Sequence, residues 1–260
     1  MRKISPKILF LLTIVFVLSA CKSDDTEEMV EDPTAENKKA LGTSAEDILS
    51  NDIYSSITVE IAFPPAFGPT ETAKINLRNF LEERVNKPGG ITFIETPIPL
   101  QSGSPFTISE IRDIEEDVRT QYTEGTNLAI FIYFSGGKSS NDTQTTVTLG
   151  TAYRNTSIVV FESTLKALTQ SNPENLPVLE STTLNHEFGH ILGLTNIQED
   201  DIHTEHEDPD HLKHCFVEEC LMYFDATNVT RSMVSRMFSK GTVPVLDPLC
   251  IEDLQAKGGL

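Results

Sequence analysis

The chain has little positive charge, with 20 lysines and arginines against 39 acidic residues among 260. Its formal net charge at pH 7 is −19. A surface of this sign repels nucleic acid and anionic lipid, so we expect no nucleic-acid partner. The length is enough for one sizeable domain with its own core.

The sequence also lacks an apolar run long enough for a comfortable membrane span. The run Ile8 to Leu18 follows a positively charged start, which is typical of a signal peptide over residues 1–20. It ends in LSAC, which resembles the bacterial lipobox, where the cysteine (here Cys21) becomes the acylated first residue. We therefore expect a lipid anchor, such as palmitate, on Cys21 as the sole contact with a membrane. An ordinary signal peptide with an incidental cysteine is the alternative.

Large apolar side chains are few in residues 22–46, so this stretch cannot bury enough surface to fold. We expect an acidic disordered tether over residues 21–52 and a single domain over residues 53–260, with subdomains at 53–195 and 196–260. The acidic run just after Cys21 resembles the export signals of surface lipoproteins. It favours the outer membrane of the bacterial cell envelope, with exposure at the cell surface left open.

Cysteine is scarce as well. With Cys21 acylated, only Cys215, Cys220 and Cys250 remain. In an oxidising compartment Cys215 and Cys220, five residues apart, are the expected disulfide, and Cys250 is an odd buried thiol. A structural zinc site on three cysteines is the alternative, but the sequence lacks the paired C-x-x-C spacing of such sites.

Histidine is absent from the first 185 residues, and all six histidines lie between His186 and His214. The first two belong to the motif H-E-x-x-H, His186-Glu187-x-x-His190. Positions four apart share a helix face, so both rings can direct a nitrogen at one ion. Glu187 lies between them and can reach a metal-bound water. The sequence therefore predicts a zinc site on a helix near residues 183–194.

A catalytic zinc usually has three protein ligands and an open position for water. In the longer motif H-E-x-x-H-x-x-G-x-x-H the third histidine comes three residues after the glycine, here Gly193. Asn196 occupies that position, and a neutral amide is a poor zinc ligand. The candidates that remain are His203, His206, His211 and His214. The acidic loop that carries the first three is either a solvated charge run or a calcium site.

His214 begins the sequence HCFVEECLMY. The pattern His-Cys-x4-Cys-x-Met resembles archaemetzincins, a group of metzincin-type zinc peptidases, and the tail at residues 244–259 resembles bacterial lipoprotein metalloproteases. The resemblance implies that His214 is the third ligand, after an inserted acidic loop at 196–213. It also implies that Met222 is the Met-turn residue beneath the metal. Tyr223 either stabilises an oxyanion or only packs.

The chain departs from archaemetzincins in one respect. Their further cysteines, which build a second zinc site, are absent here. We therefore infer a single catalytic Zn²⁺, with the Cys215–Cys220 disulfide in place of the second ion.

Apolar patterns predict strands at 57–63, 91–94, 128–134, 145–149 and 157–161, and helices at 70–85, 109–122 and 164–168. This order predicts an α/β, zincin-like fold, with a twisted mixed sheet backed by helices. The active-site helix and an irregular C-terminal subdomain with a Met-turn follow. In the peptidases that the chain resembles, an edge strand binds the substrate main chain. The residues expected to do so here are Ser157, Ile158, Val159 and Val160.

Together these features imply a monomeric zinc endopeptidase of the cell envelope, with Glu187 as general base and a protein or peptide as substrate. One alternative is a zinc-binding, inactive adhesion lipoprotein, although the intact Glu187 argues against it. The other is an amidase that acts on peptidoglycan.

Overall fold

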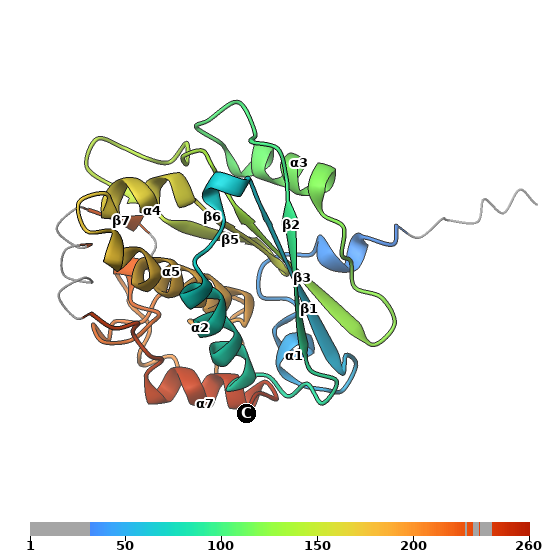
Figure 1. Cartoon of the computed structure of the whole chain (residues 1–260). Coiled ribbons are helices and arrows are strands. Elements are labelled where there is room, and N and C mark those ends of the chain that lie inside the picture. Colours follow the sequence, from blue (N-terminus) through green and yellow to red (C-terminus); the bar gives the residue numbers. More distant parts are fainter. Residues whose placement is uncertain (1–31, 227, 231–233, 235–240) are drawn as a thin grey trace, which may run out of the picture. The chain divides into compact units, whose positions relative to one another are not determined.

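The apolar run LAIFIYF forms the central strand of a five-stranded sheet, with strand order β2-β1-β3-β6-β5. The computed structural model describes residues 32–226, 228–230, 234 and 241–260 (Figure 1). Strands β1, β2, β3 and β6 are parallel, and β5 is antiparallel to β6. The strands are β1 (Ser56–Phe63), β2 (Ile91–Pro97), β3 (Asn127–Phe134), β4 (Val147–Thr148), β5 (Gly150–Arg154), β6 (Ser157–Val160) and β7 (Asn228–Val229).

Helices cover both faces of this sheet, with α2, α4 and α5 on one side and α3 on the other (Figure 1). The α-helices are α1 (Ala45–Leu49), α2 (Glu71–Glu82), α3 (Ile108–Val118), α4 (Glu162–Thr169), α5 (Leu176–Ile191) and α7 (Pro248–Ala256). The 3-10 helices are η1 (Ala35–Asn37), η2 (Pro65–Phe67), η3 (Pro173–Asn175) and η4 (Phe224–Ala226).

Strand β3 shows why the core has two layers. Successive side chains of a strand point to opposite faces, so Ile130 and Ile132 pack in the cluster that contains α5, whereas Phe131 and Tyr133 pack with α3. All four are fully buried. A strand with both faces buried reads as one continuous apolar run, which is how the sequence predicted β3.

The expected disordered tether is wrong for residues 32–52, which fold against the domain as η1 and α1. Two buried amides hold this segment. The side-chain nitrogen of Asn37 donates to the Ala129 carbonyl at 2.8 Å, and that of Asn155 donates to the Glu36 carbonyl at 2.8 Å. Hydrogen bonds thus supply order that the apolar content of the segment did not predict. The signal peptide at 1–20 and Cys21 lie outside the described residues.

The expectation that Ser157, Ile158, Val159 and Val160 form the substrate edge strand is also wrong. These residues form β6, which pairs with β3 on one side and with β5 on the other. All four are buried, as expected of an interior strand. On this side the edge of the described sheet is β5, whose sequence GTAYR contains glycine and no apolar alternation that would mark it in advance; β2 forms the opposite edge.

Candidate metal centre and cleft

Helix α5 places the two histidines of the H-E-x-x-H motif side by side in the interior. Every residue from Leu179 to Ile191 is buried. The Nε2 atoms of His186 and His190 lie 3.1 Å apart. On the far side of its ring, His186 Nδ1 lies 2.7 Å from the Leu221 carbonyl, which fixes a tautomer with the hydrogen on Nδ1 and the lone pair on Nε2.

His214 joins these two rings from a distant part of the sequence. Its ring centroid lies 5.3 Å from those of both His186 and His190. One nitrogen of each ring falls within 4.8 Å of the others. His214 Nε2 and His190 Nδ1 are buried and have no hydrogen-bond partner among the described residues. Two buried imidazoles and one half-buried imidazole that share one point are a donor set suited to zinc.

Burial keeps these rings neutral. Burial and, to a lesser extent, the neighbouring His214 together lower the pKa of His186 to about 3. The pKa values of His190 and His214 are also below the ordinary histidine value, again chiefly because of burial. A neutral imidazole is the form that binds a metal ion.

The inserted loop at residues 196–213 leaves and rejoins the fold at one place. The Thr195 hydroxyl donates to the Lys213 carbonyl, and Lys213 Nζ donates to the Asn196 carbonyl. Thr195 and Lys213 both have positive φ angles, 58° and 68°, which close the base of the loop. His214 therefore lies close to Thr195 in space, although the inserted loop separates them in sequence. Asn196, in contrast, is turned into the loop, where its backbone nitrogen donates to Asp201.

Met222 packs against the active-site helix at Gly189, and its role as a Met-turn residue stays a prediction. A Cβ built on Gly189 would lie 2.2 Å from Met222 Sδ, so only glycine allows this approach. The backbone nitrogen of Cys215 donates to the Met222 carbonyl at 2.9 Å, which ties the turn to the residue after His214. The ring of Tyr223 contacts Phe224, with centroids 4.7 Å apart, and its oxyanion role stays a prediction.

Glu187 links the helix to the edge strand β5. Its Oε2 accepts a hydrogen bond of 2.7 Å from the Ala152 backbone nitrogen, whereas Oε1 is buried without a partner among the described residues. Burial raises the pKa of this carboxyl to about 8, and the Ala152 hydrogen bond offsets part of that rise. Glu187, His190 and His214 all line one cleft of about 290 Å³.

A search of solved structures finds the crystal structure of an archaemetzincin from Methanopyrus kandleri, at 16% sequence identity and a TM-score of 0.50. The match covers 78% of this chain and 96% of that one. The chain has an archaemetzincin-like fold. The predicted α/β zincin-like class is thus confirmed. No protein-family model matches the chain, and no curated protein does.

Two of the remaining histidines lie away from this centre. His203 contacts Glu252 and Glu205, and His211 stacks on Phe224 with ring centroids 3.6 Å apart. Neither joins a group of side chains positioned to share an ion among the described residues. The carboxylates of the acidic loop contact local donors, as Asp208 does with His211 at 2.8 Å. Calcium binding by this loop stays a prediction.

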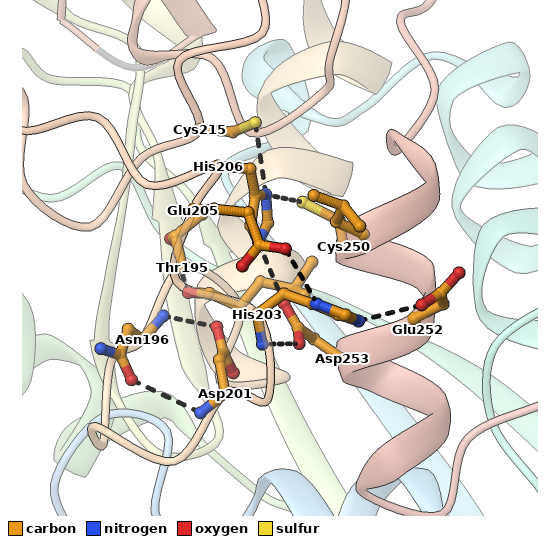
Figure 2. Close-up of polar contacts among 12 residues, drawn as sticks. Thr195, Asn196, Asp201, His203, Glu205, His206, Cys215, Cys250, Glu252 and Asp253 are labelled. Carbon is orange, nitrogen blue, oxygen red and sulfur yellow. Dashed lines mark hydrogen bonds and ion pairs between the residues drawn. The ribbon is translucent and has the colours of Figure 1, made fainter.

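His206 instead enters a second buried cluster, next to the backbone of Met222. Its Nδ1 lies 3.5 Å from Cys215 Sγ and 3.6 Å from Cys250 Sγ (Figure 2). Cys220 Sγ lies 3.8 Å from Cys250 Sγ. All three thiols are free, so the predicted Cys215–Cys220 disulfide is wrong. Cys250 is buried, as predicted.

The surroundings of this cluster favour a thiolate at Cys220, whereas hydrogen bonds to neighbouring thiols raise the pKa values of Cys215 and Cys250. The backbone nitrogens of Met222 and Asp247 donate to Cys220 Sγ at 3.3 and 3.4 Å, and that of Val217 donates to Cys215 Sγ at 3.4 Å. Hydrogen bonds from the other two thiols, Cys215 first, hold the pKa of Cys220 below its ordinary value. N–H donors directed at sulfur stabilise negative charge there.

The carboxylate of Asp253 orients His206. Its Oδ2 lies 3.0 Å from His206 Nε2, which leaves Nδ1 facing the sulfurs (Figure 2). Asp247 from the start of α7 adds an oxygen 3.1 Å from Cys215 Sγ. Sequence reasoning kept a zinc site on the three cysteines as an alternative but did not include His206, which stands in an acidic loop without a spacing motif. The odd count of three cysteines was the available signal.

Proposed function

We propose that this chain is a zinc-dependent peptidase in which Glu187 is the general base. The observation that carries the proposal is the position of Glu187 Oε1, in the same cleft as His190 and His214. This buried oxygen has no hydrogen-bond partner in the part of the chain that the structure describes. A scaffold that only held a metal would have no need of this carboxylate. The archaemetzincin-like fold supports the proposal at the level of architecture.

His186, His190 and His214 would hold the zinc ion. Their neutral rings, which bring one nitrogen each to a shared point, fit its preference for three nitrogen ligands at a catalytic site. Zinc, when bound, lowers the pKa of a water molecule and polarises a carbonyl group.

Glu187 transfers the proton in the proposed reaction. Ala152 holds one oxygen of Glu187 through a 2.7 Å hydrogen bond, so the other oxygen keeps a fixed position at the cleft. There it takes a proton from the attacking water and delivers it to the leaving amine.

We also propose a second, structural zinc ion at His206, Cys215 and Cys250, with Cys220 or Asp247 completing the set. One ligand atom of each of His206, Cys215, Asp247 and Cys250 lies within 4.8 Å of the others. The cluster is almost wholly buried, so it has no open position for water, and closed sites of Cys and His are structural. This ion would replace the disulfide that the sequence predicted.

We further propose that the protein works in the bacterial cell envelope, held by a lipid on Cys21, as a monomer that cleaves proteins or peptides. The lipobox-like sequence supports the anchor. Among the described residues, no helix has the length and apolar character needed to cross a membrane.

The experiment compares the zinc-loaded wild type with Glu187→Gln and with Glu82→Gln, an exposed glutamate on α2 as control. Casein and purified peptidoglycan are the substrates. We expect casein cleavage by the wild type and the control, and a loss of about 10²–10⁴-fold or more in Glu187→Gln with zinc still bound. Cleavage of peptidoglycan alone would favour the amidase. A zinc-bound wild type that cleaves neither would favour the binding lipoprotein.

A further inference from the structure

Some of the residues that line the cleft beside Glu187 belong neither to the sheet nor to helix α5. Gly150, Thr151 and Ala152 of the edge strand line it, as do Glu187 and His190 of α5. The rest of its lining includes Leu41 from the N-terminal segment, and Ile197 and Lys213 from the inserted loop. Two apolar side chains therefore lie in the same cavity of about 290 Å³ as the proposed catalytic groups.

Leu41 and Ile197 belong to two segments that are joined to each other. Gln198 Nε2 donates to the Leu41 carbonyl at 2.6 Å, although the two residues are 157 positions apart. Next to Leu41, Gly42 has a φ of +79°, and a Cβ built on it would lie 2.6 Å from Ile197 Cγ2. A side chain at residue 42 would push the two segments apart, so glycine is what lets them form one continuous surface.

Hydrogen bonds from Asn155 also fix the position of the segment that carries Leu41. The backbone nitrogen of Asn155 donates to the Lys39 carbonyl at 3.2 Å, and the buried Asn155 amide donates to Ser44 Oγ at 2.8 Å. Hydrogen bonds on both sides of Leu41 thus tie the segment to the turn between β5 and β6. A surface ordered before binding loses little entropy when a ligand docks on it.

Hydrogen bonds hold the positive charge of Lys213 in this part of the cleft. Lys213 Nζ donates to the carbonyls of Asn196 and Ile197, so its positive charge stays beside the apolar pair. A lysine or arginine side chain entering here would meet a like charge, and an acidic one, although Lys213 attracts it, would approach the carboxyl of Glu187. An uncharged apolar side chain meets neither penalty.

From these contacts we propose that Leu41 and Ile197 form a subsite for one bulky aliphatic or aromatic side chain of a peptide substrate. The subsite rests on the proposed peptidase function, because it names the class of peptide that the same cleft accepts. Its residues determine specificity and take no part in the chemistry.

The test uses zinc-loaded full-length protein and four peptide hydroxamates that differ in one side chain beside the metal-binding group: glycine, leucine, phenylalanine or lysine. Calorimetry gives each Kd. We expect the leucine or phenylalanine compound to bind about tenfold or more tightly than the glycine compound, because a filled apolar pocket discriminates by such factors. The lysine compound should bind no better than the glycine one. Leu41→Ala and Ile197→Ala should each reduce the leucine-to-glycine ratio, whereas Ile75→Ala, an exposed isoleucine on α2, should not.

Equal binding of all four hydroxamates by the wild type would overturn the subsite, and so would an unchanged ratio in the Leu41→Ala/Ile197→Ala double variant. Casein hydrolysis, measured separately, distinguishes this failure from failure of the proposed function. Hydrolysis without a side-chain preference refutes only the subsite. A side-chain preference without hydrolysis supports the subsite and refutes the peptidase.

Discussion

The hydroxyl of Thr195 donates a hydrogen bond to the carbonyl of Lys213, 18 residues later. This bond closes the inserted loop at its base, so the chain resumes at His214 close to the point where it departed. The third histidine of the centre is therefore remote in sequence but not in space. Several experiments test the arrangement that follows from this closure.

The first prediction concerns which histidine completes the metal centre. His214→Ala should lose zinc from the catalytic site, because two ligands bind the ion far less tightly than three. His211→Ala removes a ring of the same size from the same loop and should retain the zinc. Equilibrium dialysis followed by elemental analysis measures both. Zinc loss in His211→Ala and not in His214→Ala would refute the assignment.

The second prediction concerns the second cluster. With Cys21→Ser as background, the denatured and demetallated protein should titrate as three thiols under non-reducing conditions, because Cys215, Cys220 and Cys250 are free. A titration that finds only one thiol would instead show that Cys215 and Cys220 form a disulfide. Cobalt added to the folded protein should give thiolate charge-transfer absorption, and Cys250→Ser or His206→Ala should weaken it. His203→Ala, on the exterior of the same loop, is the matched control.

The third prediction concerns the approach of Met222 to helix α5. Gly189→Ala should destabilise the protein by about 1–3 kcal/mol, because the added methyl group overpacks a site where Met222 Sδ would lie 2.2 Å from the new Cβ. Urea unfolding measures the change. In a double-mutant cycle with Met222→Ala the two losses of stability should be less than additive. Removing the Met222 side chain removes the clash with the new methyl group, and that methyl group partly fills the space that Met222 leaves. Additive effects would show that the two residues are not in contact.

The fourth prediction concerns a buried carboxyl far from the histidines. Burial, and then the neighbouring Glu180, raise the pKa of Glu162 well above its ordinary value of 4.5. The folded state therefore keeps a proton that the unfolded state releases. Stability is full below about pH 4.5 and is lost progressively as the pH rises above it.

Thermal melts between about pH 5 and pH 9 should show this loss in the wild type and a flatter profile in Glu162→Gln, whose amide does not ionise. Glu82→Gln, at an exposed position, should follow the wild type. A wild-type melting temperature that rises over this range, relative to Glu162→Gln, would contradict the prediction.

Local pattern in the sequence was enough to predict some parts of this structure. The apolar run at residues 128–134 is β3, and the H-E-x-x-H spacing placed His186 and His190 on one helix face. The sequence after His214 indicated where Met222 would lie. In each case the residues that define the feature are close together in the chain, so a short window contains the evidence.

Other parts of the structure depend on contacts between residues too far apart in the sequence to be seen in any short stretch of it. The N-terminal segment is ordered by Asn37 and Asn155, whose amides find partners up to 119 positions away. His206 meets Cys250 only because the inserted loop folds back on α7. Neither contact has a composition or a spacing that marks it, so the sequence predicted disorder for the first and a disulfide for the second.

The hydrogen bond from Gln198 to Leu41 has a consequence for folding order. The two residues are 157 positions apart, and contacts between distant parts of a chain form later than local ones, so this contact should be among the last to form. A nascent chain can thus complete its sheet and its histidine centre while the cleft beside Glu187 still lacks one wall. Substrate selection would be the final property that the folding protein acquires.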